Sequence, residues 1–180
     1  MEKSYLQKLT IFIVLLLFTL FIYCERSFEP VSDSFECNTQ DNPVNFIFKY
    51  GVTAKNILNT FDCTFQKDMI LDPSVITQLK LSTQELDSIL ALMQSIHFFN
   101  YPDTFSIDVQ NDTAVSILPS LKYSFFVEKD SVFKTLYWND CIIYPDTAAE
   151  KLKNLCRYII HTIKSKPEYK ALPEPRGGYD

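Results

Sequence analysis

The residues of this 180-residue chain best suited to chemistry are its five cysteines. Cys24 directly follows an apolar stretch, which is where a lipid-modified cysteine would stand. The other four are an even number, Cys37, Cys63, Cys141 and Cys156, and would permit two disulfides outside the cytoplasm. Their spacing leaves the pairing open.

Two of these cysteines also have a purely structural interpretation. Cys63 and Cys156 fall on the apolar faces of an expected strand and an expected helix, where a free cysteine behaves as a small hydrophobic residue. No pair has the Cys-x-x-Cys spacing of zinc or redox sites. We therefore expect no metal and no cofactor.

The only two histidines are His97 and His161. Each stands near the end of a predicted helix, where histidine more often interacts with the helix dipole than catalyses. Neither lies in a nucleophile-elbow context. We expect no catalytic residue, and a hydrolase that uses one histidine with a carboxylate is the alternative.

Four aromatic residues, Phe126, Phe133, Tyr137 and Trp138, crowd one predicted hairpin. If one face of this hairpin is the core, the other face exposes some of them, and an exposed aromatic patch can mark a partner site. The competing interpretation is that the hairpin is central and covered on both faces. We take the four residues as the candidate partner surface.

Composition excludes several classes of function. The three glycines, at 51, 177 and 178, cannot form a glycine-rich phosphate loop. The formal net charge is −5, and no run of Lys or Arg occurs, which disfavours nucleic acid as a partner. No feature of the sequence specifies an oligomeric state.

An apolar segment, Leu9–Tyr23, comes after Lys3 and Lys8 and predicts contact with a membrane. Its length suits a secretory signal, but large residues precede Cys24 where signal peptidase and the lipobox both require small ones. An uncleaved anchor, a lipid anchor at Cys24 and simple secretion therefore stay open. We assign residues 1–24 to this segment and the polar residues 25–42 to a tether.

The remaining chain alternates between strand and helix patterns. Residues 44–50 and 57–66 each predict a strand, and a capping box of Ser82 and Glu85 begins a helix that ends before Pro102. Strands are then predicted at 105–109, 121–127 and 132–138, with a turn at 129–131.

The last predicted helix starts near Asp146 or Thr147, with Thr147 and Glu150 as a capping box, and Pro167 ends it. Its buried stripe is expected to consist of Leu152, Leu155, Cys156, Ile159 and Ile163. The order predicts an α+β domain over 43–167, with an antiparallel sheet and two amphipathic helices packed on one face, followed by an extended tail over 168–180.

Several phrases resemble an uncharacterised family of exported bacterial proteins, many of them lipoproteins. They are FKYG (48–51), LNTF…TFQKDM (58–69), LSTQELDSILALM…FFNYP (81–102) and EYKALPEPRGGY (168–179). The resemblance implies a domain of the cell envelope over residues 44–179 and transfers no catalytic residue.

From these observations we expect a membrane-tethered, extracytoplasmic domain of the cell envelope. Its role would be structural or the binding of an envelope protein, without catalysis. Besides the hydrolase, a lipid-carrying envelope protein is a further alternative, which an internal apolar cavity of several hundred Å³ would favour.

Overall fold

The computed structural model describes residues 37–39, 42–108, 115–143 and 145–179. The apolar segment and Cys24 lie outside these residues, as does most of the tether. The compact unit that contains the described residues begins at Cys37. No helix of the described part of the chain is both long and apolar enough to span a membrane.

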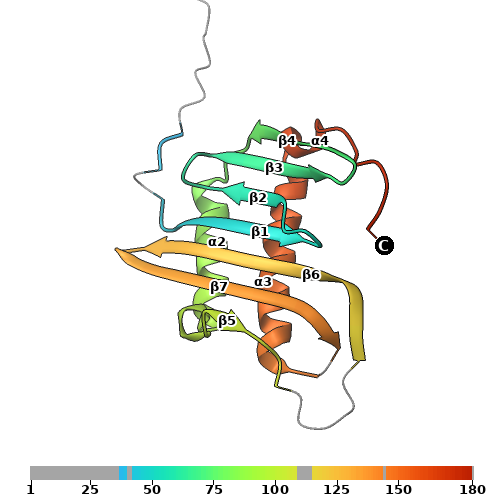
Figure 1. Ribbon diagram of the computed structural model, residues 1–180. Coiled ribbons are helices and arrows are strands. Elements are labelled where there is room, and N and C mark those ends of the chain that lie inside the picture. Colours follow the sequence, from blue (N-terminus) through green and yellow to red (C-terminus); the bar gives the residue numbers. More distant parts are fainter. Residues whose placement is uncertain (1–36, 40–41, 109–114, 144, 180) are drawn as a thin grey trace, which may run out of the picture. The chain divides into compact units, whose positions relative to one another are not determined.

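Seven strands form one sheet, in the order β4-β3-β2-β1-β6-β7-β5 (Figure 1). Their bounds are β1 Asn45–Gly51, β2 Asn56–Asn59, β3 Thr64–Met69, β4 Asp72–Gln78, β5 Thr104–Phe105, β6 Val115–Lys129 and β7 Val132–Ile143. Neighbours are antiparallel except β5 and β7, which pair in parallel. The sheet is therefore mixed, whereas we had predicted a purely antiparallel one, because α2 carries the chain from β4 to the opposite edge and β5 enters there in the direction of β7.

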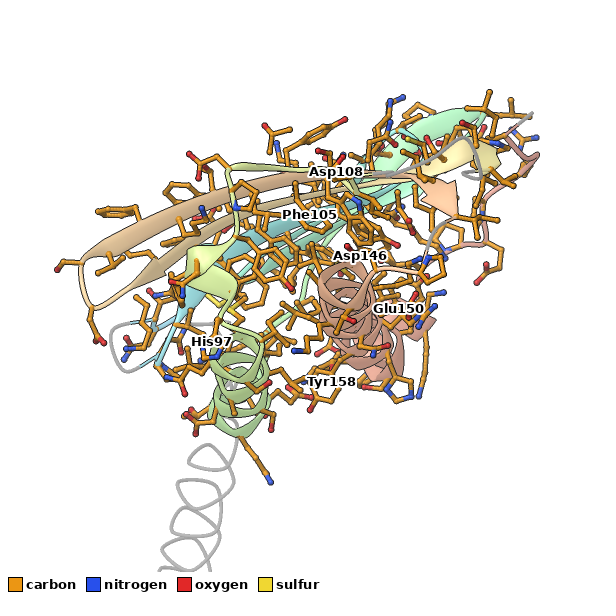
Figure 2. The ribbon with its side chains drawn as sticks, turned by 90° about the horizontal axis from the view of Figure 1, so that it is seen from below. His97, Phe105, Asp108, Asp146, Glu150 and Tyr158 are labelled. Carbon is orange, nitrogen blue, oxygen red and sulfur yellow. A yellow bond between two sulfur atoms is a disulfide. The ribbon has the colours of Figure 1, made fainter. Side chains whose placement is uncertain are left out.

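Both long helices pack on the same face of the sheet, as predicted (Figures 1 and 2). They are α2, Thr83–Ser95, and α3, Thr147–Ser165, and two short helical segments, η1 (Phe98–Asn100) and α4 (Pro167–Lys170), come after them. The capping box at the start of α2 is confirmed, because Ser82 and Glu85 each accept a hydrogen bond from the other's backbone N–H.

The predicted cap of α3 is wrong in detail. Asp146 is the N-cap, and its carboxylate accepts a 2.7 Å hydrogen bond from the backbone N–H of Ala149. Asp146 already fills the role that the sequence gave to Thr147, and Glu150 instead lies near Lys153, 3.7 Å away.

The predicted strand over 57–66 is two strands with a turn between them. Asn59 accepts a hydrogen bond from the backbone N–H of Phe61 and donates one to Asp62, so its side chain bends the chain here. Cys63 comes next in a left-handed conformation, with φ of 50°. The apolar alternation that ran through Phe61 and Cys63 is thus broken, and β4, which the sequence did not predict, extends the sheet beyond β3.

The β6–β7 hairpin turns where predicted, at Asp130 and Ser131, and pairs Lys129 with Val132. Both strands are longer than predicted because the pairing continues to Val115 and Ile143, past an irregularity between Ser116 and Leu121. Alternate residues of this hairpin therefore point toward the helices or away from them.

The core lies between the sheet and the two helices. The predicted stripe of α3 is confirmed, because all five of its residues are buried: Leu152, Leu155, Cys156, Ile159 and Ile163. It packs in one cluster with sheet residues such as Phe48, Phe125 and Trp138. Burial of each large side chain contributes about 1.5–3 kcal/mol, which holds the helices against this face of the sheet. No described helix covers the opposite face, which we call the open face (Figure 2).

Candidate functional site

The sheet face opposite the helices carries an exposed aromatic cluster. Phe126 of β6 and Phe133 and Tyr137 of β7 point to this open face and are 37%, 61% and 42% exposed. The rings of Phe126 and Phe133 stack with centroids 6.1 Å apart, and the ring of Phe61 lies 6.1 Å from Phe126 on the other side. Three of the four residues predicted for a partner surface thus lie on one exposed face.

Trp138, the fourth predicted residue, is not part of this surface. It is fully buried on the helix side of β7, where its ring stacks on Tyr123 at 5.3 Å and contacts Phe105 at 5.6 Å. The reason is the period of two along a strand, which sends neighbours such as Tyr137 and Trp138 to opposite faces.

A hollow of about 410 Å³ lies within the open face. Its lining comes from β1, β6, β7 and the segment that leads into β5, and includes Ile47, Lys49, Asp103, Phe126 and Tyr137. The register explains this arrangement, because Ile47 pairs with Phe126, Lys49 with Ser124, and Ser124 with Tyr137. The small Ser124 between larger side chains leaves the space.

The charges around the hollow are few. Lys49 is exposed and forms no ion pair with any described residue. Asp103 is neutralised by Lys134, whose ammonium lies 2.6 Å from the carboxylate and also donates to the carbonyl of Tyr101. The hollow therefore presents an apolar floor beside a cation that no described carboxylate pairs, which suits an apolar side chain accompanied by an acidic group.

A second hollow, the helix-side cleft, lies between the end of α2 and the start of α3 and has a volume of about 430 Å³. Ile96, Tyr101, Phe105 and Ala148 give it an apolar lining, and the hydroxyl of Tyr101 donates a 2.9 Å hydrogen bond to the carbonyl of Ala148. His97 lies at its rim (Figure 2).

The backbone explains the position of His97. It comes directly after the C-cap of α2 in a left-handed conformation, with φ of 55°, and its N–H bonds to the carbonyl of Gln94. Glycine or asparagine usually fills such a position, although histidine tolerates it better than most residues do.

The two histidines differ in their positions relative to the described hollows. The described residues that line the helix-side cleft include no carboxylate, serine or cysteine beside His97. His161 is exposed on α3 and lines neither hollow. Across the described residues, no group of three or more His, Cys, Asp or Glu side chains could hold a metal ion.

The described cysteines form one disulfide and include two free thiols. Cys37 is bonded to Cys63, with Cα atoms 5.7 Å apart. Cys63 is buried as expected, but in a turn and in a bond rather than as a free strand residue. Cys141 and Cys156 are free, and complete burial raises the pKa of the Cys156 thiol well above its ordinary value.

No family model, no curated protein and no solved structure matches this chain. The resemblance to exported bacterial proteins therefore stays a prediction.

Two contributors to the open face were missed by sequence reasoning. Ile47 alternates with the buried Phe46 and Phe48, so the strand pattern contained the signal that it faces away from the core. Phe61 gave no such signal, because the same alternation placed it on a strand that the turn at Asn59 interrupts.

Proposed function

We propose that this chain is a membrane-tethered, extracytoplasmic domain that binds a protein of the cell envelope through the open face of its sheet, without catalysis. The observation that carries the proposal is the aromatic cluster of the open face, Phe61, Phe126, Phe133 and Tyr137, of which Phe126 and Tyr137 also line the hollow. Aromatic residues that flank a pocket are typical anchors of protein interfaces.

The charge at the hollow specifies the partner further. Lys49 has no carboxylate partner among the described residues, so an interface that buries it must supply one. The fitting partner presents an apolar side chain to the hollow and an Asp or Glu next to it.

Two observations support the compartment. The apolar segment Leu9–Tyr23 precedes the domain with Lys3 and Lys8 before it, which favours export of the domain. The disulfide between Cys37 and Cys63 is of a kind that persists outside the cytoplasm.

The interface is tested by two matched substitutions, each examined by cross-linking and co-purification from membranes. Tyr137→Ala on the open face should remove the captured partner. Tyr158→Ala on α3, which is 37% exposed on the helix side, should retain it (Figure 2). Equal capture by both variants, with equal melting temperatures, would refute the open face as the interface.

The mode of attachment is tested by intact-mass measurement of the membrane-extracted protein. A diacylglycerol-modified chain that begins at Cys24 indicates a lipoprotein, whereas a chain that begins at Met1 indicates an uncleaved anchor. Recovery of the whole protein in the soluble extracellular fraction would contradict tethering.

The helix-side cleft favours a second candidate function, the carriage of a small apolar ligand such as a lipid chain. Its volume of about 430 Å³ falls within the range of ligand pockets. Ala148→Leu should fill the cleft and abolish binding of a fluorescent fatty acid, and Ala91→Leu, at an exposed position of α2, should not. Absence of fatty-acid binding by the unaltered protein would exclude this candidate.

A further inference from the structure

The C-terminal segment of the chain packs against the sheet. After α4 it passes beside the turn between β3 and β4 (Figure 1), where Arg176 forms a parallel bridge with Ile70. The segment Pro173–Tyr179, which we call the strap, meets the fold at three charged residues, Lys67, Asp68 and Asp72.

Lys67 is the first of these anchors. Its side chain is only 3% exposed, and its ammonium donates a 2.9 Å hydrogen bond to the carbonyl of Pro173 and lies 3.4 Å from the carboxylate of Glu174. The ring of Tyr169 lies beneath it, 4.8 Å away. A buried ammonium needs such partners, and two of the three belong to the strap.

Asp72 and Asp68 are the other two anchors. Asp72 accepts two hydrogen bonds from the guanidinium of Arg176, in the bidentate geometry that is specific for arginine. Asp68 accepts hydrogen bonds from the hydroxyls of Tyr179 and Thr53 and from the backbone N–H of Ile70. Burial raises the pKa of the Asp68 carboxyl, but these hydrogen bonds outweigh it and lower the pKa below its ordinary value.

The backbone at the site is strained. Ile70 is β-branched and adopts a left-handed conformation with φ of 62°, which is rare for such a residue. Strain of this kind concentrates where a fold clamps a ligand. Gly177 of the strap, with φ of 84°, lies so close to Leu71 that a Cβ would be 2.9 Å from its side chain. Because the Leu71 side chain is 73% exposed and can move, the left-handed φ of Gly177 is the stronger reason for glycine at this position of the strap.

Most residues of the strap are nevertheless exposed. A hollow of about 180 Å³ lies beside the strap, and its lining includes Tyr50, Lys67 and Tyr169 together with Pro175 and Tyr179 of the strap. The side chains of Glu174 and Arg176 are 87% and 74% exposed, so the pair of Arg176 with Asp72 is open to water and contributes little to stability. The buried ammonium of Lys67, in contrast, needs a partner from the strap or from a segment that replaces it. One isolated bridge is the only sheet pairing that the strap makes with the described residues.

We propose that the surface under the strap, formed by Lys67, Asp68, Ile70 and Asp72 and called the groove below, is a peptide-binding site and that the strap is its resident, displaceable ligand. The ligand class is an extended segment with an acidic residue between two prolines, an arginine two residues later and a tyrosine three residues after that, as in the strap itself. Lys67 selects the carboxylate, Asp72 the arginine and Asp68 the tyrosine hydroxyl. The strap blocks the groove until a competing segment of this class is present.

The proposal can be tested because the strap and an added peptide would compete for the same site. A tethered strap has an effective concentration on the order of millimolar, so a free peptide must compete against it. We would titrate a fluorescent peptide with the sequence of residues 170–180 into the full chain and into the variant Arg176→Glu, Tyr179→Phe. The variant should bind the peptide at least about tenfold more tightly than the unaltered chain, because its own strap competes poorly.

The matched control is the variant Arg157→Glu, Tyr158→Phe, which makes the same chemical changes at exposed positions of α3. It should bind the peptide as weakly as the unaltered chain. A second variant replaces residues 173–179 by a Gly-Ser segment of equal length and should bind at least as tightly as the first. A scrambled peptide should bind to none of them.

The proposal is overturned if neither altered chain, each folded by its cooperative melting transition, binds the peptide more tightly than the control variant. It is also overturned if the scrambled peptide binds equally well. The groove and the open face involve different residues, so failure here leaves the proposed function of the open face unaffected.

Discussion

Cys63, in the left-handed turn between β2 and β3, is covalently bonded to Cys37, the first described residue of the folded unit. The two cysteines are 26 positions apart, and the loop that their bond closes includes β1 and β2. It thus ties the end of the polar segment to the sheet, and the domain begins at this bond rather than at β1.

The disulfide should contribute measurably to stability. For a closed loop of this length, the loss of unfolded-state entropy corresponds to about 3.5 kcal/mol, so Cys37→Ser with Cys63→Ser should lower the free energy of unfolding by about that amount. Urea unfolding of the oxidised protein measures the difference. Cys141→Ser, which removes a free and partly exposed thiol, is the control and should change stability by less than about 0.5 kcal/mol. Equal effects of the two changes would contradict the assigned pairing.

Glu85 should make stability depend on pH. Burial raises the pKa of its carboxyl, but hydrogen bonds from Lys166 and from the backbone of Ser82 outweigh burial and lower the pKa. Because the folded-state pKa is depressed, the contribution is fully present above the unfolded value of about 4.3 and is lost as pH falls through the folded value. Glu85→Gln should therefore destabilise the protein at pH 7 and much less at pH 3.

Urea unfolding at several pH values tests this prediction. Glu150→Gln is the matched control, because the nearest cations to Glu150 are 3.7 and 4.0 Å away and its side chain is exposed. It should change stability by less than about 0.5 kcal/mol at pH 7. If Glu85→Gln lowers the free energy of unfolding by the same amount at pH 7 and pH 3, the charge of Glu85 does not stabilise the fold.

Elements specified by neighbouring residues were predictable from the sequence. Ser82 and Glu85 are three residues apart, and the stripe from Leu152 to Ile163 repeats within one helix, so local spacing determined both. The turn at Asp130 and Ser131 was equally local.

The features that the sequence did not predict depend on distant residues. A strand was predicted at 105–109, but β5 spans only Thr104–Phe105 and pairs in parallel with β7 rather than with β6, the next strand along the chain, and no local pattern encodes that pairing. The strap is held by pairs such as Lys67 and Glu174, 107 residues apart. The aromatic composition of the hairpin indicated the candidate surface. Which of its residues are exposed depends on the strand register, in which Tyr123 pairs with Trp138 on the core side.

Tyr137 is exposed and Trp138 is buried, so alanine substitutions at these two positions should differ in their effect on stability. Trp138→Ala should cost about 3–5 kcal/mol, because it removes a buried ring and leaves a cavity. Tyr137→Ala, one residue earlier on the open face, should cost less than about 1 kcal/mol. Thermal and urea unfolding of both variants measure the difference. Similar losses would contradict the register of β7.

The β6–β7 turn should accept a stabilising substitution. Asp130 and Ser131 form a two-residue turn with φ of 48° and 64°, the class in which Asn-Gly is preferred. Glycine adopts such a conformation without steric cost, so Ser131→Gly should raise the free energy of unfolding by about 0.5–1 kcal/mol.

The control for this turn is Ser116→Gly, which places glycine at an exposed position inside β6. It should lower the free energy of unfolding by about 0.5–1 kcal/mol, because glycine loses more backbone entropy in a strand and relieves no strain there. Opposite signs for the two substitutions are expected from urea unfolding under identical conditions. Destabilisation by both would mean that Ser131 is not held in a left-handed turn, and the close pairing of Lys129 with Val132 would then have to be revised.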